Sequence, residues 1–193
     1  MRKSLSFGLI LAAAVLLTGC GEKFEPTEST VYVTSKGVVQ SAIMESFDKA
    51  YYNFEELSED IEKEVKSYCL DLNEEAITVE SLTQEGDTVK LLMNYQTVED
   101  YASFNEVILF AGTYAEAVDA GYVAEELYDT EGQTVENDLE ELAELKVIVT
   151  EESVCIQTSG KIRYISDNVT MVDKKLARAV EAGKSHPAFV LYK

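Results

Sequence analysis

Residues 53–72, NFEELSEDIEKEVKSYCLDL, carry the strongest local pattern in this chain of 193 residues. Their large apolar side chains recur at spacings of three and four, which places them on one stripe of an α-helix. Asn53 is a favoured N-cap, and Glu55 and Glu56 occupy the first turn, where acidic side chains are stabilising. Each large side chain contributes about 1.5–3 kcal/mol when buried, so we expect this helix to be the main support of the core. The stripe consists of Phe54, Leu57, Ile61, Val65, Tyr68 and Leu72.

Most of the remaining pattern before residue 100 is that of β-strands. Residues 31–33 and 38–39 are β-branched and aromatic and flank a turn containing Gly37, which predicts a hairpin. The second strand continues toward Phe47 with a face of period two that Glu45 interrupts. Residues 89–95 alternate between apolar and polar, as expected for a strand with one solvated face.

The second half of the chain predicts short helices and further strands. Thr97 with Asp100, and Thr113 with Glu116, match the capping-box pattern that begins a helix. Ser159-Gly160 predicts a tight hairpin turn between two strands. The elements expected after residue 145 are strands over 147–150, 154–158, 161–166 and 169–172, a basic helix over 174–182, and a closing strand over 189–192.

These elements predict an α+β fold. Strands outnumber helices and most connections are short, which favours antiparallel pairing. We therefore expect a single domain over residues 30–193, made mainly of antiparallel sheet with one long amphipathic helix, at about 53–72, packed on it. A chain of this length can bury one sizeable core.

The N-terminus carries a different pattern. Arg2 and Lys3 precede an apolar run over 5–17, which is shorter than the roughly 20 residues of a membrane-spanning helix. The run closes with Leu17-Thr18-Gly19-Cys20, which resembles the lipobox of bacterial lipoproteins.

That resemblance implies a division of the chain and a location. Residues 1–19 would be a lipoprotein signal peptide, and Cys20 would carry a thioether-linked diacylglycerol after cleavage before it. Residues 20–29 are polar and would form a tether. The expected location is the extracytoplasmic face of the cell membrane, with the membrane bound through the lipid on Cys20.

The chain is strongly acidic. It has 36 acidic and 16 basic residues; removal of Arg2 and Lys3 with the signal peptide leaves 14 basic residues, and the net charge changes from −20 to −22. Such a surface repels nucleic acid and anionic lipid headgroups, so we expect no nucleic-acid partner. The charge is explained by solubility, or alternatively by a cationic peptide or solute as ligand.

Cys69 and Cys155 remain once Cys20 is lipidated. Disulfides persist outside the cytoplasm, and a bridge between these two would close a loop of about 86 residues and stabilise the fold by roughly 4 kcal/mol. The alternative is a pair of free thiols that pack as small apolar side chains.

Catalytic motifs are scarce. His186 stands in a Ser-His-Pro sequence typical of a loop; an alternative pairs it with Cys155 or Cys69 as base and nucleophile. Arg163 near Cys155 resembles part of the Cys, His and Arg set of sortase-like transpeptidases, but the order differs and that family's Thr-Leu-x-Thr-Cys strand is absent. There is no Gly-x-Ser-x-Gly elbow, no Cys-x-x-Cys pair and no phosphate-binding glycine loop. We therefore predict no catalytic residue, no metal and no cofactor.

One aromatic cluster is a candidate binding patch. Tyr51 and Tyr52 precede the long helix and Phe54 begins it. Adjacent side chains point in different directions, so one tyrosine packs under the helix and the other is exposed. The alternative is that all three residues serve packing alone.

Several segments resemble lipoproteins of unknown function from clostridial-type Gram-positive bacteria, and this resemblance implies no activity. The leading hypothesis is a non-enzymatic, lipid-anchored binding or scaffolding module of the cell envelope, with an envelope protein as partner. The alternative is an accessory lipoprotein for a cationic peptide or solute, and the third is a cell-wall hydrolase or transpeptidase. The resembling segments are GVV (37–39), ESFDK (45–49), YY (51–52), EEL (55–57), YASFN (101–105) and FAGT (110–113).

Overall fold

The computed structural model describes residues 24–72 and 75–193, which form two β-sheets and four helices. The seven-stranded sheet has the order β11 (Val169–Asp173), β12 (Leu176–Ala179), β9 (Cys155–Thr158), β1 (Thr30–Val33), β2 (Val39–Ser46), β4 (Thr88–Tyr95) and β3 (Ile77–Glu85). The six-stranded sheet has the order β5 (Leu109–Thr113), β8 (Lys146–Thr150), β13 (Ala188–Tyr192), β10 (Ile162–Ser166), β6 (Leu127–Asp129) and β7 (Thr134–Val135). The helices are α1 (Phe54–Leu72), α2 (Val98–Asn105), α3 (Tyr114–Asp119) and α4 (Leu139–Leu142).

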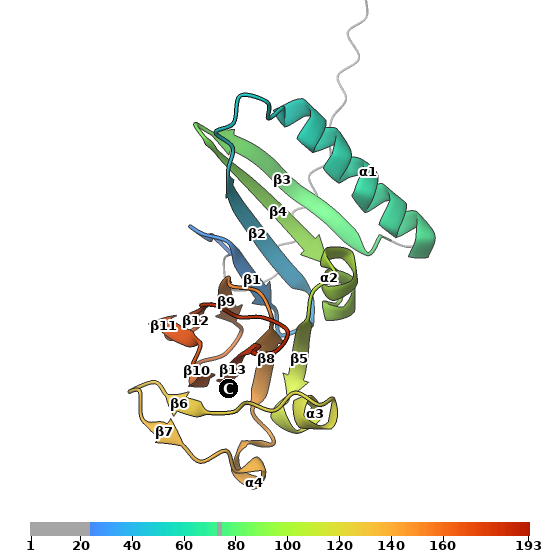
Figure 1. Ribbon diagram of the computed structural model, residues 1–193. Coiled ribbons are helices and arrows are strands. Elements are labelled where there is room, and N and C mark those ends of the chain that lie inside the picture. Colours follow the sequence, from blue (N-terminus) through green and yellow to red (C-terminus); the bar gives the residue numbers. More distant parts are fainter. Residues whose placement is uncertain (1–23, 73–74) are drawn as a thin grey trace, which may run out of the picture.

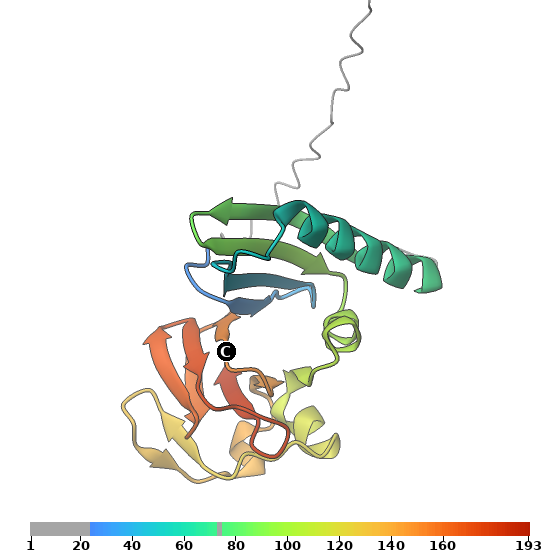
Figure 2. The same cartoon turned by 45° about the horizontal axis from the view of Figure 1, so that its top comes forward.

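The strand pairing confirms the predicted α+β fold with mainly antiparallel sheet. Among the described strands, only β1 and β9 pair in parallel. Figure 1 shows α1 alongside β3 at the edge of the seven-stranded sheet, and α3 and α4 at the far end beside the six-stranded sheet. Helix α2 lies where the chain passes from one sheet to the other, as the turned view in Figure 2 also shows.

The core is built from strands of both sheets. Ile148 on β8, Ile156 on β9 and Ile162 on β10 belong to one cluster and are completely buried. Strand β4 alternates between buried and partly exposed residues as predicted. All of this packing lies within residues 24–72 and 75–193.

Helix α1 is present at the predicted position, but it is not the main support of the core. None of its residues is fully buried. Ile61, Val65 and Tyr68 pack against the core only partly, and Leu72 is 46% exposed. The helix lies along β3, an edge strand, so only part of its apolar stripe meets the sheet.

Two predictions for the second half of the chain are wrong. Ser159-Gly160 does not close a hairpin, because β9 belongs to the seven-stranded sheet and β10 to the six-stranded one. Residues 174–182 do not form a helix but contain β12, which pairs with β11 and β9. In β12, Ala177 and Ala179 are buried on either side of an exposed Arg178, which is the period of a strand.

The described part of the predicted tether, residues 24–29, is packed on the seven-stranded sheet. Phe24 stacks on Tyr32 with ring centroids 6.0 Å apart. The Glu28 carboxylate accepts hydrogen bonds from Arg178 on β12, with the shortest at 2.6 Å. This segment is therefore part of the domain, and fewer residues than predicted separate Cys20 from it.

Candidate ligand-binding site

The connection between β2 and α1 brings together the aromatic residues predicted as a binding patch. Phe47 stacks on Tyr52 with ring centroids 4.8 Å apart, and Tyr51 meets the edge of Tyr52 at 4.9 Å. Tyr52 donates its backbone N–H to the Lys49 carbonyl at 3.0 Å, which fixes the turn before the helix. Tyr51 is 78% exposed and Tyr52 is 42% exposed. The connection therefore holds an ordered aromatic stack that faces solvent.

Tyr52 forms one wall of an apolar groove of about 320 Å³ between α1 and the face of the seven-stranded sheet. Ile43 on β2 and Leu82 on β3 form its floor, and Leu57 and Ile61 on α1 line the opposite side. The groove exists because α1 covers the edge of the sheet incompletely. The full lining is Ile43, Glu45, Ser46, Phe47, Tyr52, Leu57, Ile61, Leu82, Val89 and Leu91; we call it the aromatic groove.

Acidic side chains lie at one side of the aromatic groove and on the helix beside it. Glu45 lines it directly, and its carboxylate has no hydrogen-bond or ion-pair partner among the residues of the described ranges. On α1, the exposed Asp60 lies three residues after Leu57, which makes the two side chains neighbours on the helix surface. Lys49 at the nearby turn is paired with Asp48 at 3.0 Å. The rim is thus negative, and α1 as a whole carries seven acidic residues and two lysines.

The sequence identified only part of this site. Of the predicted patch, Tyr52 lines the groove, Tyr51 stands beside it, and Phe54 is half-buried outside the lining. Phe47 and Leu82 also line the groove, and the sequence pattern does not single them out. The sequence signal that indicates this part of the site is Glu45, a carboxylate that interrupts the apolar face of β2.

A second cleft, of about 350 Å³, lies between the β6–β7 hairpin and the β10–β11 turn. Tyr128, Asp129 and Asp167 are among its polar lining residues, and the two aspartates are its acidic ones. Asp129 already accepts backbone hydrogen bonds from Glu131 and Gln133 at 2.8 and 2.9 Å. The hydroxyl of Tyr128 donates to Glu126, and this hydrogen bond raises the tyrosine pKa.

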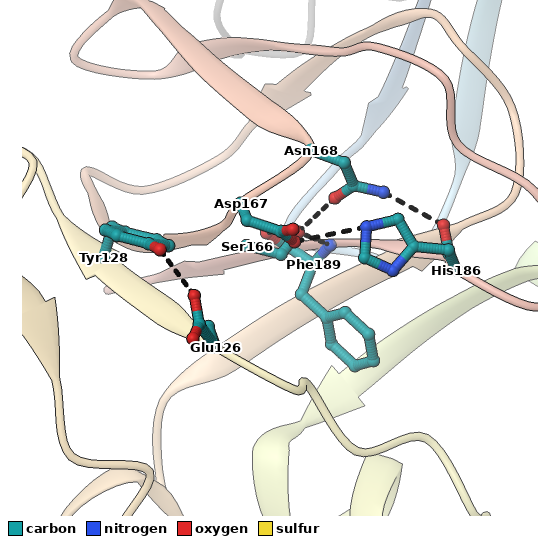
Figure 3. A network of polar contacts seen from close by, with 7 residues as sticks. All are labelled: Glu126, Tyr128, Ser166, Asp167, Asn168, His186 and Phe189. Atoms are coloured by element: carbon teal, nitrogen blue, oxygen red, sulfur yellow. Dashed lines mark hydrogen bonds and ion pairs between the residues drawn. The ribbon is translucent and has the colours of Figure 1, made fainter.

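The residues beside this second cleft do not form a hydrolase triad (Figure 3). His186 Nε2 lies 3.3 Å from an Asp167 carboxylate oxygen. Ser166, which is buried, donates its hydroxyl proton to Asn168 at 2.6 Å and accepts the Phe189 N–H at 2.8 Å. Asn168 in turn donates to the His186 carbonyl at 2.9 Å. The network fastens the β10–β11 turn to the start of β13, and histidine and serine have separate partners.

The two cysteines are free thiols, so the predicted disulfide alternative is wrong. Cys69 lies on α1 with its Sγ 3.6 Å from the Ile77 carbonyl of β3, whereas Cys155 lies on β9, four strand positions away in the same sheet. Four strand spacings amount to about 19 Å, well beyond the Cα separation of about 7 Å that a disulfide allows. Burial raises the pKa of the Cys155 thiol, which keeps it protonated and unreactive.

A half-buried acid, Glu152, is hydrogen-bonded to α2. The Tyr101 hydroxyl donates to the Glu152 carboxylate at 2.8 Å, and the ring of Tyr101 packs edge-on against Tyr95. Burial raises the pKa of Glu152, with the hydrogen bond from Tyr101 acting in the opposite direction. Ionised Glu152 is therefore disfavoured in the folded chain.

Glu152→Gln is expected to make stability less dependent on pH. The pKa of Glu152 is raised in the folded chain. The contribution of Glu152 to the free energy of unfolding is therefore lost as the pH rises from the ordinary carboxyl pKa, near 4.5, through the folded pKa. Glutamine retains an acceptor for Tyr101 and carries no charge, so the variant should gain stability over the wild type in that interval. Urea unfolding between pH 4 and 7 measures the difference. Glu62→Gln on the exposed face of α1 is the control; equal slopes for wild type and Glu152→Gln would contradict the argument.

Neither a metal cluster nor a membrane-spanning helix is present in the described ranges: no three His, Cys, Asp or Glu side chains converge to hold an ion, and no helix is long and apolar enough to cross a bilayer. Cys20 and residues 1–19 lie outside those ranges. Comparisons with protein-family models, with curated proteins and with solved structures give no significant match.

Proposed function

We propose that this protein is a non-enzymatic, lipid-anchored module on the outer face of the cell membrane, and that its aromatic groove binds a basic amphipathic peptide segment of an envelope protein. The observation that carries the proposal is the apolar groove bordered by carboxylates. At about 320 Å³, it falls at the lower end of the range of ligand pockets, about 300–1,000 Å³. It therefore suits one or two apolar side chains of a longer segment.

Charge complementarity selects the class of peptide. A Lys- or Arg-bearing segment would place its apolar residues against Phe47 and Tyr52 and its cations against Glu45 and Asp60. Exposed stacked aromatics are typical of binding surfaces, since Tyr supplies a large contact area at low entropic cost. The net charge of −22 after loss of residues 1–19 adds long-range attraction for the same partner.

The second cleft favours a different candidate function, an accessory lipoprotein for a small cationic solute. Tyr128 and two carboxylates, Asp129 and Asp167, line it. Those carboxylates are engaged by backbone N–H groups and by His186, however, whereas Glu45 in the aromatic groove is not. The groove is therefore the better-supported site.

Tyr52→Ala is expected to weaken binding of a synthetic basic amphipathic peptide by about tenfold, the loss typical of a truncated aromatic anchor. The probe is a fluorescent peptide of alternating Lys and Leu, with a peptide of Glu and Leu as the charge control, and fluorescence anisotropy measures the affinity.

Tyr128→Ala is the matched control, because it removes the same side chain from the second cleft. The proposal requires wild-type affinity for this variant. If Tyr128→Ala weakens binding and Tyr52→Ala does not, the second cleft is the site and the groove proposal is wrong.

A further inference from the structure

Strand β3 is the outermost strand of the seven-stranded sheet, and with nine residues it is the longest strand in the described ranges. Figure 1 shows it at the edge of the sheet, with α1 running along it. β3 pairs with β4 on one side and with no described strand on the other. Residues 83–85 are exposed, and Leu82 beside them is half-buried and lines the aromatic groove. The open edge and the groove therefore adjoin.

The β3–β4 turn determines which backbone groups point toward the open edge. Glu85 and Thr88 lie opposite each other across the two-residue turn Gly86-Asp87, and the residues that close such a hairpin exchange hydrogen bonds. Hydrogen-bonding directions alternate along an antiparallel strand. Glu85 therefore bonds to β4, whereas the N–H and C=O groups of Gln84 and Leu82 point away from β4, toward the side that has no strand.

The open stretch has a defined length. A β-bulge shifts the register of β3 between Val79 and Ser81. Nearer the start of the strand, the Cys69 thiol of α1 contacts the Ile77 carbonyl at 3.6 Å. The edge is therefore regular and open over residues 81–85, which span about 17 Å.

The other sheet edges in the described ranges offer less. β11 and β5 have five residues each, and β7 has two. β5 also packs against α2 and α3. The end of β3 is thus the edge best suited to receive another strand.

A strand added antiparallel to this edge would point every second side chain toward the aromatic groove. The residue directly opposite Leu82 would share its face of the sheet, with the two Cβ atoms about 5 Å apart. Leu57 and Ile61 of α1 line the groove on that face, and both are only half-buried. An apolar side chain at this position would therefore cover apolar surface that the chain leaves partly exposed.

The charges of the edge favour a basic segment and disfavour a second copy of this chain. β3 carries Glu80 and Glu85 and neither lysine nor arginine. Two β3 strands side by side would bring carboxylates together, which is a common protection of edge strands against self-association. Glu85 lies on the face opposite Leu82, so the alternate residues of an added strand would lie on its side. Lysine or arginine at those positions would be attracted to it.

We infer that the basic segment proposed for the aromatic groove binds as an extended strand, antiparallel to β3 along residues 81–85, with apolar and cationic side chains in alternation. This is recognition by β-strand addition. The inference rests on the proposed function for the class of partner and adds the conformation and sequence period of that partner. A helical segment would leave the backbone groups of Leu82 and Gln84 unused.

Backbone methylation of the alternating Lys and Leu peptide tests this mode. With leucines toward the groove, the leucine N–H groups bond to β3 and the lysine N–H groups point away from it. Methylation of the leucine nitrogens should weaken binding at least tenfold, because it removes several backbone hydrogen bonds at once. The same number of methyl groups on the lysine nitrogens is the matched control and should leave the affinity unchanged. Fluorescence anisotropy with the full chain measures the three affinities.

Gln84→Pro tests the protein side of the same contact. Proline is tolerated on an edge strand where the N–H faces outward, and it removes a donor to the added strand, so the affinity should fall about tenfold. Gln84→Ala removes the same side chain, retains the N–H and should bind as the wild type does. Hydrogen exchange adds a readout independent of these variants: the peptide should slow exchange of the Leu82 and Gln84 amides, with the Thr83 amide, which points toward β4, as the reference.

The outcomes separate this inference from the proposed function. Loss of affinity on leucine methylation and in Gln84→Pro, with slower exchange at Leu82 and Gln84, supports strand addition. Equal affinities for the three peptides, with Tyr52→Ala still weakening binding, overturn strand addition and leave the groove proposal intact. Equal losses for the two methylated peptides, or a loss confined to the lysine-methylated one, also overturn it. If the wild-type chain binds none of the peptides, the proposed function fails and this inference fails with it.

Discussion

Gly160→Ala is expected to lower the free energy of unfolding by about 2–3 kcal/mol, the upper part of the range for overpacking. A Cβ at this position would lie 2.6 Å from both the carbonyl carbon and the carbonyl oxygen of Lys193. That backbone is fixed, because Lys161 donates its N–H to the Lys193 carbonyl at 2.8 Å and accepts the Lys193 N–H at 3.0 Å. Relief of the clash requires the end of β13 to separate from the start of β10.

Gly86→Ala is the matched control for this experiment. Gly86 has a φ of +60° in the β3–β4 turn and nothing within 4 Å of an added Cβ, so its substitution strains the backbone without a clash. Loss of left-handed freedom alone is worth about 1 kcal/mol. Urea unfolding of the two variants compares the costs. If Gly160→Ala loses no more stability than Gly86→Ala, residues 159–160 behave as an ordinary hairpin turn. The placement of β9 and β10 in different sheets would then be wrong.

The sequence correctly predicts those helices and strands whose local residue pattern agrees with the way they pack. The stripe of α1, the alternation of β4 and the two capping boxes are each set by neighbours along the chain. Thr97 accepts the Asp100 N–H at 3.0 Å, and the Asp100 carboxylate accepts the Thr97 N–H at 3.1 Å, as the spacing predicts. The fold class followed from these elements.

Long-range pairing escaped prediction because local chemistry does not encode it. Ser159-Gly160 has the composition of a hairpin turn, but Gly160 is required by the approach of Lys193, which is distant in the sequence. The basic run over 174–182 predicts a helix, yet its alternating alanines pack in a strand between β9 and β11. The division into two sheets is decided by such pairings.

The candidate site was predictable only where aromatic residues adjoin in the sequence. Tyr51 and Tyr52 stand out as a pair, whereas Leu82 reaches the aromatic groove from β3.

Exchange of residues 1–20 for a secretory leader without a cysteine is expected to move nearly all of the protein from the membrane fraction to the medium. Buried acyl chains contribute about 0.8 kcal/mol per methylene group, and stable anchoring takes two chains, as diacylglycerol provides. Without them, a globule with a net charge near −22 has little to hold it at an anionic surface. Immunoblots of membrane and medium fractions measure the redistribution.

Cys69→Ser in the unaltered chain is the control for this exchange. It removes a thiol from α1 and leaves Cys20 in place, so the protein should stay in the membrane fraction. Retention of the exchanged chain at the membrane would show that the domain attaches by other means.

Mass spectrometry of the N-terminal peptide of protein taken from native membranes tests the anchor most directly. The account predicts a first residue Cys20 whose mass is increased by a diacylglyceryl group, with residues 1–19 removed. An unmodified Cys20 thiol, or a peptide that still contains Leu17-Thr18-Gly19 ahead of the cysteine, would contradict it.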